Sequence, residues 1–208
     1  MARVLTLQQI ISLSRKGSYD TYYSTRQHYE ADTCPFCLGN GLDLNVNRLL
    51  QMPADILHWI AWEAPAVLRP KSMQNGLARH IMIVPVQHVT SIFDFTGDPW
   101  AELNTVLKWV KEKFKIVGAI IIARTDDITM NGGTELHFSL QVKVPDRTMP
   151  NRPRMTEVFS KTGDEDDDNA ARGERFAVCY AQGVSPERFN ELVSAGTMSS
   201  DGCQASQI

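Results

Sequence analysis

The residues best suited to chemistry are two cysteines, Cys34 and Cys37, which are separated by a proline and a phenylalanine. This two-residue spacing lets both thiolates reach one tetrahedral zinc ion at Zn–S distances of about 2.3 Å. A closed site needs two further ligands, and the sequence holds five histidines that can supply them: His28, His58, His80, His88 and His137. The pair therefore predicts a metal site completed by histidines.

A redox pair is the first alternative. Cys-Pro-Phe-Cys is also similar to the motif of glutaredoxin-like proteins, in which the first thiol lies at a helix N-terminus. No apolar strand precedes the pair here, and residues 39–41 (Gly-Asn-Gly) break the helix that this mechanism needs. Structural zinc is therefore favoured over a redox pair or an inert pair.

Three apolar segments are candidate strands that could position these side chains. Residues 80–85 and 119–123 are rich in β-branched residues, as is typical of strands that are buried on both faces, and residues 58–62 form a shorter candidate. Residues 136–144 alternate strictly. Their apolar members predict a core face, whereas His137, Ser139, Gln141 and Lys143 form a polar face available to a ligand.

One long helix is expected to open at Asp98 and Pro99 and to end at Gly118. Its apolar stripe, expected to be core, comprises Trp100, Leu103, Val106, Leu107, Val110 and Phe114. Shorter helices are expected over residues 6–17 and after Ser185 and Pro186. These elements, without any internal repeat, predict an α+β fold: a mainly antiparallel sheet with one long helix packed on it and a structural zinc site.

Changes in composition divide the 208 residues into four segments. Residues 1–32 form an N-terminal helix and linker, in which 18–33 show no firm period, and residues 33–146 form the main domain. Residues 147–192 form a C-terminal extension with a solvated acidic loop at 164–168 and a short helix. Residues 193–208 are expected to be a disordered tail, and the remaining cysteines, Cys179 and Cys203, are isolated in the sequence.

Composition excludes several classes of protein. The chain has 43% hydrophobic and 22% charged residues, which is typical of a globular protein. Its net charge of −3 gives no basic surplus for binding a nucleic-acid backbone. No stretch approaches the roughly 18 apolar residues that span a bilayer, and the first residues lack the apolar core of a secretory signal. We therefore expect a soluble cytoplasmic protein with no nucleic-acid or membrane partner.

A longer pattern resembles a known family. Residues 79–88 (RHIMIVPVQH) are similar to the "His, apolar strand, Pro-x-x-His" segment of the histidine triad (HIT) superfamily. Residues 137–141 (HFSLQ) lie where that family carries His-x-His-x-His, or His-x-His-x-Gln in the galactose-1-phosphate uridylyltransferase branch. The resemblance covers residues 33–145 in collinear order, and the cysteine pair makes the uridylyltransferase branch the most similar.

The resemblance implies roles for individual residues. Zinc would be held by Cys34, Cys37, His88 and His137. A nucleoside phosphate or nucleotide sugar would be bound by Asp126, Gly132, Gly133, Thr134 and Gln141, with Gln141 orienting a phosphate oxygen. Asp126 falls where family members carry a phosphate-binding Asn, and a carboxylate there would repel a phosphate. The family often forms homodimers, which implies a second copy as a partner.

The pattern departs from the family at Ser139. The family's middle histidine attacks the α-phosphorus and forms a covalent nucleotidyl-histidine, whereas a serine hydroxyl is a poor nucleophile without an adjacent base. The sequence offers no such base, because His137 would be bound to the metal. A binding protein without the covalent mechanism is therefore expected. The alternative is an active hydrolase or nucleotidyltransferase that uses direct attack, with Ser139 and Gln141 in the catalytic positions.

Overall fold

The computed structural model describes residues 19–37, 49–64, 77–95, 99–126, 136–146, 148 and 163–203, with only the backbone described for 163–170. The chain divides into two compact units. The first comprises residues 1–34, 127–135 and 158–208, and the second comprises residues 35–126 and 136–157. The two ends of the chain, which differ in composition, thus contribute to one unit.

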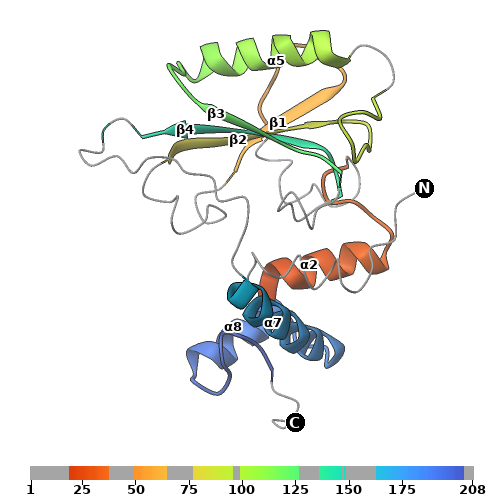
Figure 1. Ribbon diagram of the computed structural model, residues 1–208, viewed down its shortest axis with the longest axis vertical. Helices are drawn as coiled ribbons and strands as arrows, with labels where there is room; N and C mark the ends of the chain where they lie inside the picture. Colours follow the sequence, from red (N-terminus) through yellow and green to blue (C-terminus); the bar gives the residue numbers. More distant parts are fainter. Residues whose placement is uncertain are drawn as a thin grey trace. The chain divides into compact units, whose positions relative to one another are not determined.

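The second unit is built on a four-stranded sheet (Figure 1). Its strands are β1 (Trp59–Glu63), β2 (Leu77–Pro85), β3 (Ile120–Arg124) and β4 (Ser139–Pro145). They lie in the order β1-β2-β4-β3, and every neighbouring pair is antiparallel. The predicted α+β class with a mainly antiparallel sheet is confirmed.

Helix α5 (Pro99–Lys113) covers one face of this sheet (Figure 1). Leu103, Val106 and Val110 are buried in one core with Trp59, Ala61, Ile81, Ile83, Phe138, Leu140 and Val142. Burial of this apolar stripe is what stabilises the helix, as the sequence predicts. The helix ends at Lys113 rather than Gly118. Trp100 is 42% exposed rather than core, because it lies in the first turn, where its ring contacts Phe95 at the edge of the core.

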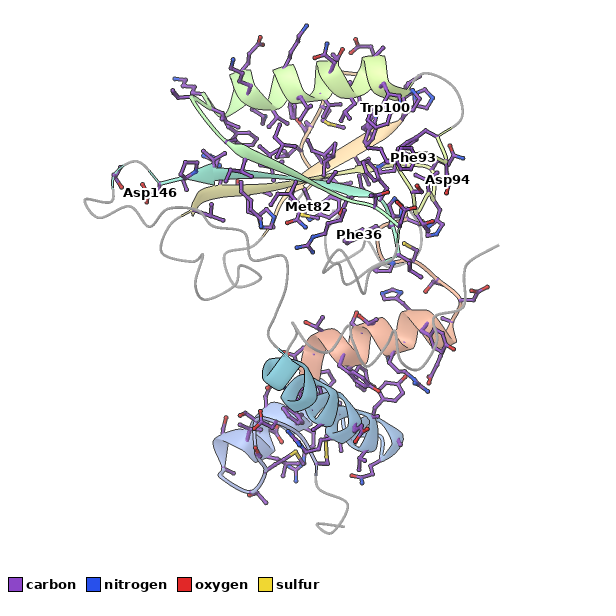
Figure 2. All side chains as sticks on the ribbon, in the orientation of Figure 1. Phe36, Met82, Phe93, Asp94, Trp100 and Asp146 are labelled. Atoms are coloured by element: carbon purple, nitrogen blue, oxygen red, sulfur yellow. A yellow bond between two sulfur atoms is a disulfide. The ribbon has the colours of Figure 1, made fainter. Side chains whose placement is uncertain are left out.

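The opposite face of the sheet, which we call the second face, carries both apolar and polar side chains. Trp62, Met82 and Val84 form a smaller core there with Phe36, and Figure 2 shows Met82 and Phe36 on the side of the sheet away from α5. The strand register places the predicted polar face of β4 on this side, since Gln141 pairs with Met82. These polar residues are themselves buried: Ser139, Gln141 and Lys143, together with His80 of β2.

Strand β3 differs from the expectation that residues 119–123 are buried on both faces. Ile120 and Ile121 are 38% and 52% exposed. The reason is the strand order, because among the described strands β3 pairs only with β4 and lies at the end of the sheet. An apolar run alone does not distinguish a central strand from an edge strand.

Three helices form the described part of the first unit: α2 (Tyr19–Glu30), α7 (Gly163–Ala181) and α8 (Pro186–Ser194). Helix α2 contacts both of the others. Their contacts are largely aromatic, and the buried rings are those of Tyr19, Tyr22, Phe176 and Phe189. The Ser185 side chain accepts a hydrogen bond from the Arg188 N–H (3.3 Å), which confirms the predicted start of α8.

Several expectations for this unit are wrong. Residues 19–30 form α2, and its core contacts are made by tyrosines, which a search for aliphatic periodicity passes over. The acidic run at 164–168 lies in α7 rather than in a loop, because acidic residues are favoured near a helix N-terminus. With 19 residues, α7 is a second long helix, longer than α5, which the sequence did not predict.

The last difference from the sequence-based expectations concerns the C-terminal tail. Cys203 is buried and forms a disulfide with Cys179 of α7, so residues 193–203 are not a disordered tail. The helix expected at 6–17 lies outside the described residues. Among the residues described, no helix has the length and apolar character needed to cross a lipid bilayer.

Candidate metal centre

The four residues expected to bind metal lie together in the structure. The ligand atoms of Cys34, Cys37, His88 and His137 all lie within 4.8 Å of one another. The Cys37 Sγ lies 3.2 Å from Nδ1 of His88 and 3.8 Å from Nδ1 of His137. A tetrahedral zinc ion at normal bond lengths places its sulfur and nitrogen ligands about 3.6 Å apart. The residues therefore fit a zinc ion, and neither cysteine forms a disulfide.

The ring of His137 is held in the orientation that a metal ligand needs. Its Nε2 lies 3.1 Å from the carbonyl oxygen of Pro85 and can only donate there. The ring proton is thereby assigned to Nε2, so the lone pair of the neutral imidazole is on Nδ1, the atom that faces Cys37. A hydrogen bond from the second ring nitrogen to a carbonyl is the usual support of a metal-bound histidine.

His88 is positioned by the loop that follows β2. Two backbone hydrogen bonds tie this loop to the neighbouring strands: Phe138 N–H donates to Val89 O (2.7 Å), and Asp126 N–H donates to Thr90 O (2.8 Å). As a result, the His88 and His137 rings meet edge to face, with centroids 5.1 Å apart. The ends of β2 and β3 and the start of β4 therefore converge at this site.

The cysteine segment is anchored by the aromatic residue inside it. Phe36 makes edge contacts with the rings of Trp62 (5.5 Å between centroids) and His137 (5.9 Å). These contacts hold the turn that carries Cys37 against the second face of the sheet. No role was predicted for Phe36 from the sequence, although an aromatic residue between two closely spaced cysteines is a signal for such an anchor.

Ser139 and Gln141, the expected catalytic residues, follow His137 on the same face of β4. The Gln141 carboxamide makes contacts on both sides when its nitrogen donates to Nε2 of His80 (3.2 Å). Its oxygen then accepts from Nε (3.1 Å) and Nη1 (3.3 Å) of Arg124. The sequence assigned no site role to Arg124 and offered His80 only as one of five candidate metal ligands. Instead His80 is buried within β2.

Asp126, expected in the ligand site, lies at the junction between β3 and the His88 loop. Its backbone adopts a left-handed conformation (φ 63°), and its carboxylate accepts a hydrogen bond from Thr125 Oγ1 (2.7 Å). The same Thr125 oxygen accepts from the Ile92 N–H (2.8 Å). Asp126 therefore helps to position the His88 loop. The other expected ligand-binding residues, Gly132, Gly133 and Thr134, lie outside the described residues.

The two remaining histidines take no part in this cluster. His28 pairs with Thr33 Oγ1 (2.9 Å), and burial lowers the pKa of its imidazole. His58 is exposed and pairs with Glu102 through both its ring and its backbone N–H. Only two of the five histidines therefore lie among the candidate metal ligands.

No protein-family model and no curated protein matches this sequence. Solved structures of HIT proteins are similar to it. One is a HIT family protein from Bacillus anthracis, with 18% identity, a TM-score of 0.38 and coverage of 74% of this chain and 100% of that chain. A histidine triad nucleotide-binding protein from Candida albicans has 14% identity, a TM-score of 0.39 and coverages of 65% and 93%. A HIT family hydrolase from Legionella pneumophila has 15% identity, a TM-score of 0.37 and coverages of 56% and 99%.

Proposed function

We propose that this chain is a zinc-containing, HIT-like protein that binds a nucleoside phosphate or a nucleotide sugar. The observation that carries the proposal is the approach of the Cys37 Sγ to Nδ1 of both His88 and His137, residues that are 51 and 100 positions away in the sequence. With Cys34 they supply four protein ligands, which fill a tetrahedral zinc ion and leave no open position for a water. The zinc is therefore structural, and it joins the cysteine turn to the ends of β2 and β4.

The ligand is proposed for the second face of the sheet. Support comes from the resemblance of residues 79–88 and 137–141 to the HIT motifs and from the position of Ser139 and Gln141 beside the metal ligand His137. Gln141 retains the residue type that the resemblance assigns to phosphate orientation. Its carboxamide is held between His80 and Arg124, so its orientation is defined before any ligand binds.

The covalent mechanism of the family is not part of the proposal. Ser139 stands at the nucleophile position and requires a base to be activated. His137 lies two residues before Ser139, but its Nε2 donates a hydrogen bond to the Pro85 carbonyl and its Nδ1 faces Cys37. The His80 ring contacts Gln141 instead. We therefore infer that the chain binds its ligand without forming a nucleotidyl intermediate.

Two measurements on the purified full chain test this proposal. Elemental analysis should find one zinc per chain. Calorimetric titration with nucleoside monophosphates, nucleotide sugars and dinucleoside polyphosphates should give saturable binding for at least one of them. A metal-free chain would overturn the zinc assignment, and the absence of binding across the panel would overturn the ligand assignment.

A second candidate is an active hydrolase or nucleotidyltransferase in which water or an acceptor attacks the phosphorus directly. The hydrogen bonds from Arg124 to Gln141 favour it, because a positive charge beside the residue expected to orient phosphate would stabilise the charge that develops on phosphate oxygens. Turnover assays on the same panel decide between the candidates. Turnover that Gln141→Ala abolishes and Ser139→Ala preserves would establish direct attack, whereas no turnover at high protein concentration would exclude it.

Location and assembly complete the proposal. We expect the chain to be cytoplasmic and to form a homodimer, both from the sequence and its resemblance. Light scattering on the purified protein tests the second point, since a monomer at working concentration would contradict it.

A further inference from the structure

We infer that Arg124 is the residue that binds the anionic phosphoryl group of the ligand on the second face. This inference rests on the proposed function and extends it to a residue that no HIT motif contains. It assigns to a guanidinium on β3 the positive charge that holds the phosphoryl group.

The strand register places Arg124 beside Ser139 and near Gln141, the residue expected to orient phosphate. Arg124 pairs directly with Ser139, and Ile122 pairs directly with Gln141. Directly opposed residues of antiparallel strands point to the same face, with Cβ atoms about 4.5–5.5 Å apart. Arg124 therefore projects from the second face next to Ser139, on the side of β4 opposite to β2.

The hydrogen bonds to Gln141 fix the direction of the guanidinium. Both Nε and Nη1 of Arg124 lie within 3.3 Å of the carboxamide oxygen, so the planar group is aligned with the residue expected to orient phosphate. An arginine side chain carries five N–H donors and keeps its charge at every physiological pH. Proteins often bind phosphate oxygens with a planar guanidinium, because it can donate two parallel hydrogen bonds at once.

The charge of the second face has the sign that a phosphate requires. The described strand residues on this face include three with basic side chains, His80, Arg124 and Lys143, and none with a carboxylate. The one acidic strand residue, Glu63, pairs with Ile81 and therefore lies on the face covered by α5. Among the described strands, this face is thus the electropositive one.

Differences in exposure make Arg124 the contact point for a ligand arriving from solvent. Ser139 and Gln141 are only 3% and 4% exposed. Arg124 lies on the edge strand β3 and is partly exposed. An anion therefore meets the guanidinium first, and Gln141 and Ser139 follow as neutral hydrogen-bonding groups behind it.

The test compares ligands with and without a phosphoryl group. Wild type, Arg124→Gln and Arg124→Lys are titrated with AMP, adenosine, UMP and uridine, and zinc content and thermal unfolding verify that each variant is folded. Arg124→Gln should weaken nucleotide binding about 10- to 100-fold, as expected for the loss of hydrogen bonds to a charged group, and leave nucleoside binding unchanged. Arg124→Lys should lose less nucleotide affinity than Arg124→Gln, because lysine keeps the positive charge although it lacks the planar set of donors. Lys111→Gln, which removes the same charge from the exposed surface of α5, is the matched control and should bind like wild type.

The outcomes separate this inference from the proposed function. If wild type binds a nucleotide and Arg124→Gln binds it equally well, the role of Arg124 is wrong and the proposed function stands. If Arg124→Gln weakens the binding of nucleotide and of nucleoside equally, Arg124 serves only to position Gln141. That result also overturns the inference. If wild type binds neither nucleotide, nor any member of the wider panel, both proposals fail together.

Discussion

The Nε2 atom of His137 lies 3.1 Å from the carbonyl oxygen of Pro85, while Nδ1 of the same ring faces the Cys37 thiol. This one ring therefore connects the end of β2, the start of β4 and the cysteine turn. A metal site assembled in this way links segments that are far apart in the sequence. Its ligands consequently affect both metal affinity and folding.

The first prediction concerns the two histidine ligands. His88→Ala and His137→Ala should each lower zinc affinity by more than about 100-fold, a larger loss than removal of a supporting hydrogen bond causes. The two metal-free variants should differ in stability, because the His137 side chain is buried (3% exposed) whereas that of His88 is exposed. In the presence of a chelator, only His137→Ala should be markedly less stable than wild type, since it leaves a cavity and the Pro85 carbonyl without its partner.

Competition with a chromogenic zinc chelator and thermal unfolding measure these two effects. His58→Ala is the matched control, because His58 is exposed and lies outside the cluster, and it should keep wild-type zinc affinity. Retention of stoichiometric zinc at wild-type affinity by both ligand variants would show that the cluster is not a metal site.

The second prediction concerns Gly202, next to the disulfide. Its φ of +115° is unfavourable for any residue with a side chain, and an added Cβ would lie 2.8 Å from Cβ of Arg175 and 3.1 Å from the Phe176 ring. Gly202→Ala should therefore lower the free energy of unfolding of the first unit by roughly 2–4 kcal/mol. Gly196, with φ +70° and no atom within 4 Å of an added Cβ, is the control. Gly196→Ala should cost only about 1 kcal/mol, and equal costs would contradict the steric explanation.

The candidate metal ligands could be predicted from the sequence because a zinc site would impose both residue type and number. Two closely spaced cysteines require two more ligands, and the resemblance selected His88 and His137 from five histidines. The same holds for α5 and β2. The apolar stripe of α5 matches its buried face, and the apolar run of β2 matches its central place in the sheet. In each case the local pattern and the tertiary environment agree.

Arg124 and α2 could not be predicted, because their roles depend on partners distant in the sequence. Arg124 is one of 21 basic residues, and only the β3–β4 register places it beside Gln141. Helix α2 has little aliphatic periodicity, and its tyrosines become core residues only through contact with rings of α7 and α8. The pairing of Cys179 with Cys203 likewise needed the fold of the segment after α8.

The third prediction concerns this disulfide, which joins α7 to the segment after α8. Its sequence separation of 24 residues corresponds to a loss of unfolded-state entropy worth about 3 kcal/mol. Reduction or Cys203→Ser should therefore lower the stability of the first unit by about 2–4 kcal/mol in urea unfolding. A reductant should have no further effect on the stability of this unit in Cys203→Ser.

The redox state of this pair also bears on the proposed location. Disulfides persist in oxidising compartments and are rare in the cytosol. Alkylation of free thiols at the moment of lysis, followed by mass spectrometry, measures the oxidised fraction in cells. A fully oxidised pair would count against the cytoplasmic location that we propose.

The last prediction concerns the alkaline stability of the first unit. The Tyr180 hydroxyl donates a hydrogen bond to the Glu30 carboxylate (2.8 Å). Burial, followed by this hydrogen bond, raises the pKa of Tyr180 from 10.0 to about 12, and burial also raises the pKa values of Tyr19 and Tyr22. Between pH 10 and about 12 the folded state therefore retains protons that the unfolded chain has lost, so the free energy of unfolding falls as the pH rises through this window.

Urea unfolding at increasing pH, with tyrosinate absorbance recorded in parallel, measures the effect. Tyr180→Phe should show a shallower decline than wild type, and Glu30→Gln should bring the tyrosinate titration to lower pH. Identical pH profiles for wild type and Tyr180→Phe would show that the contact with Glu30 does not control the ionisation of this hydroxyl.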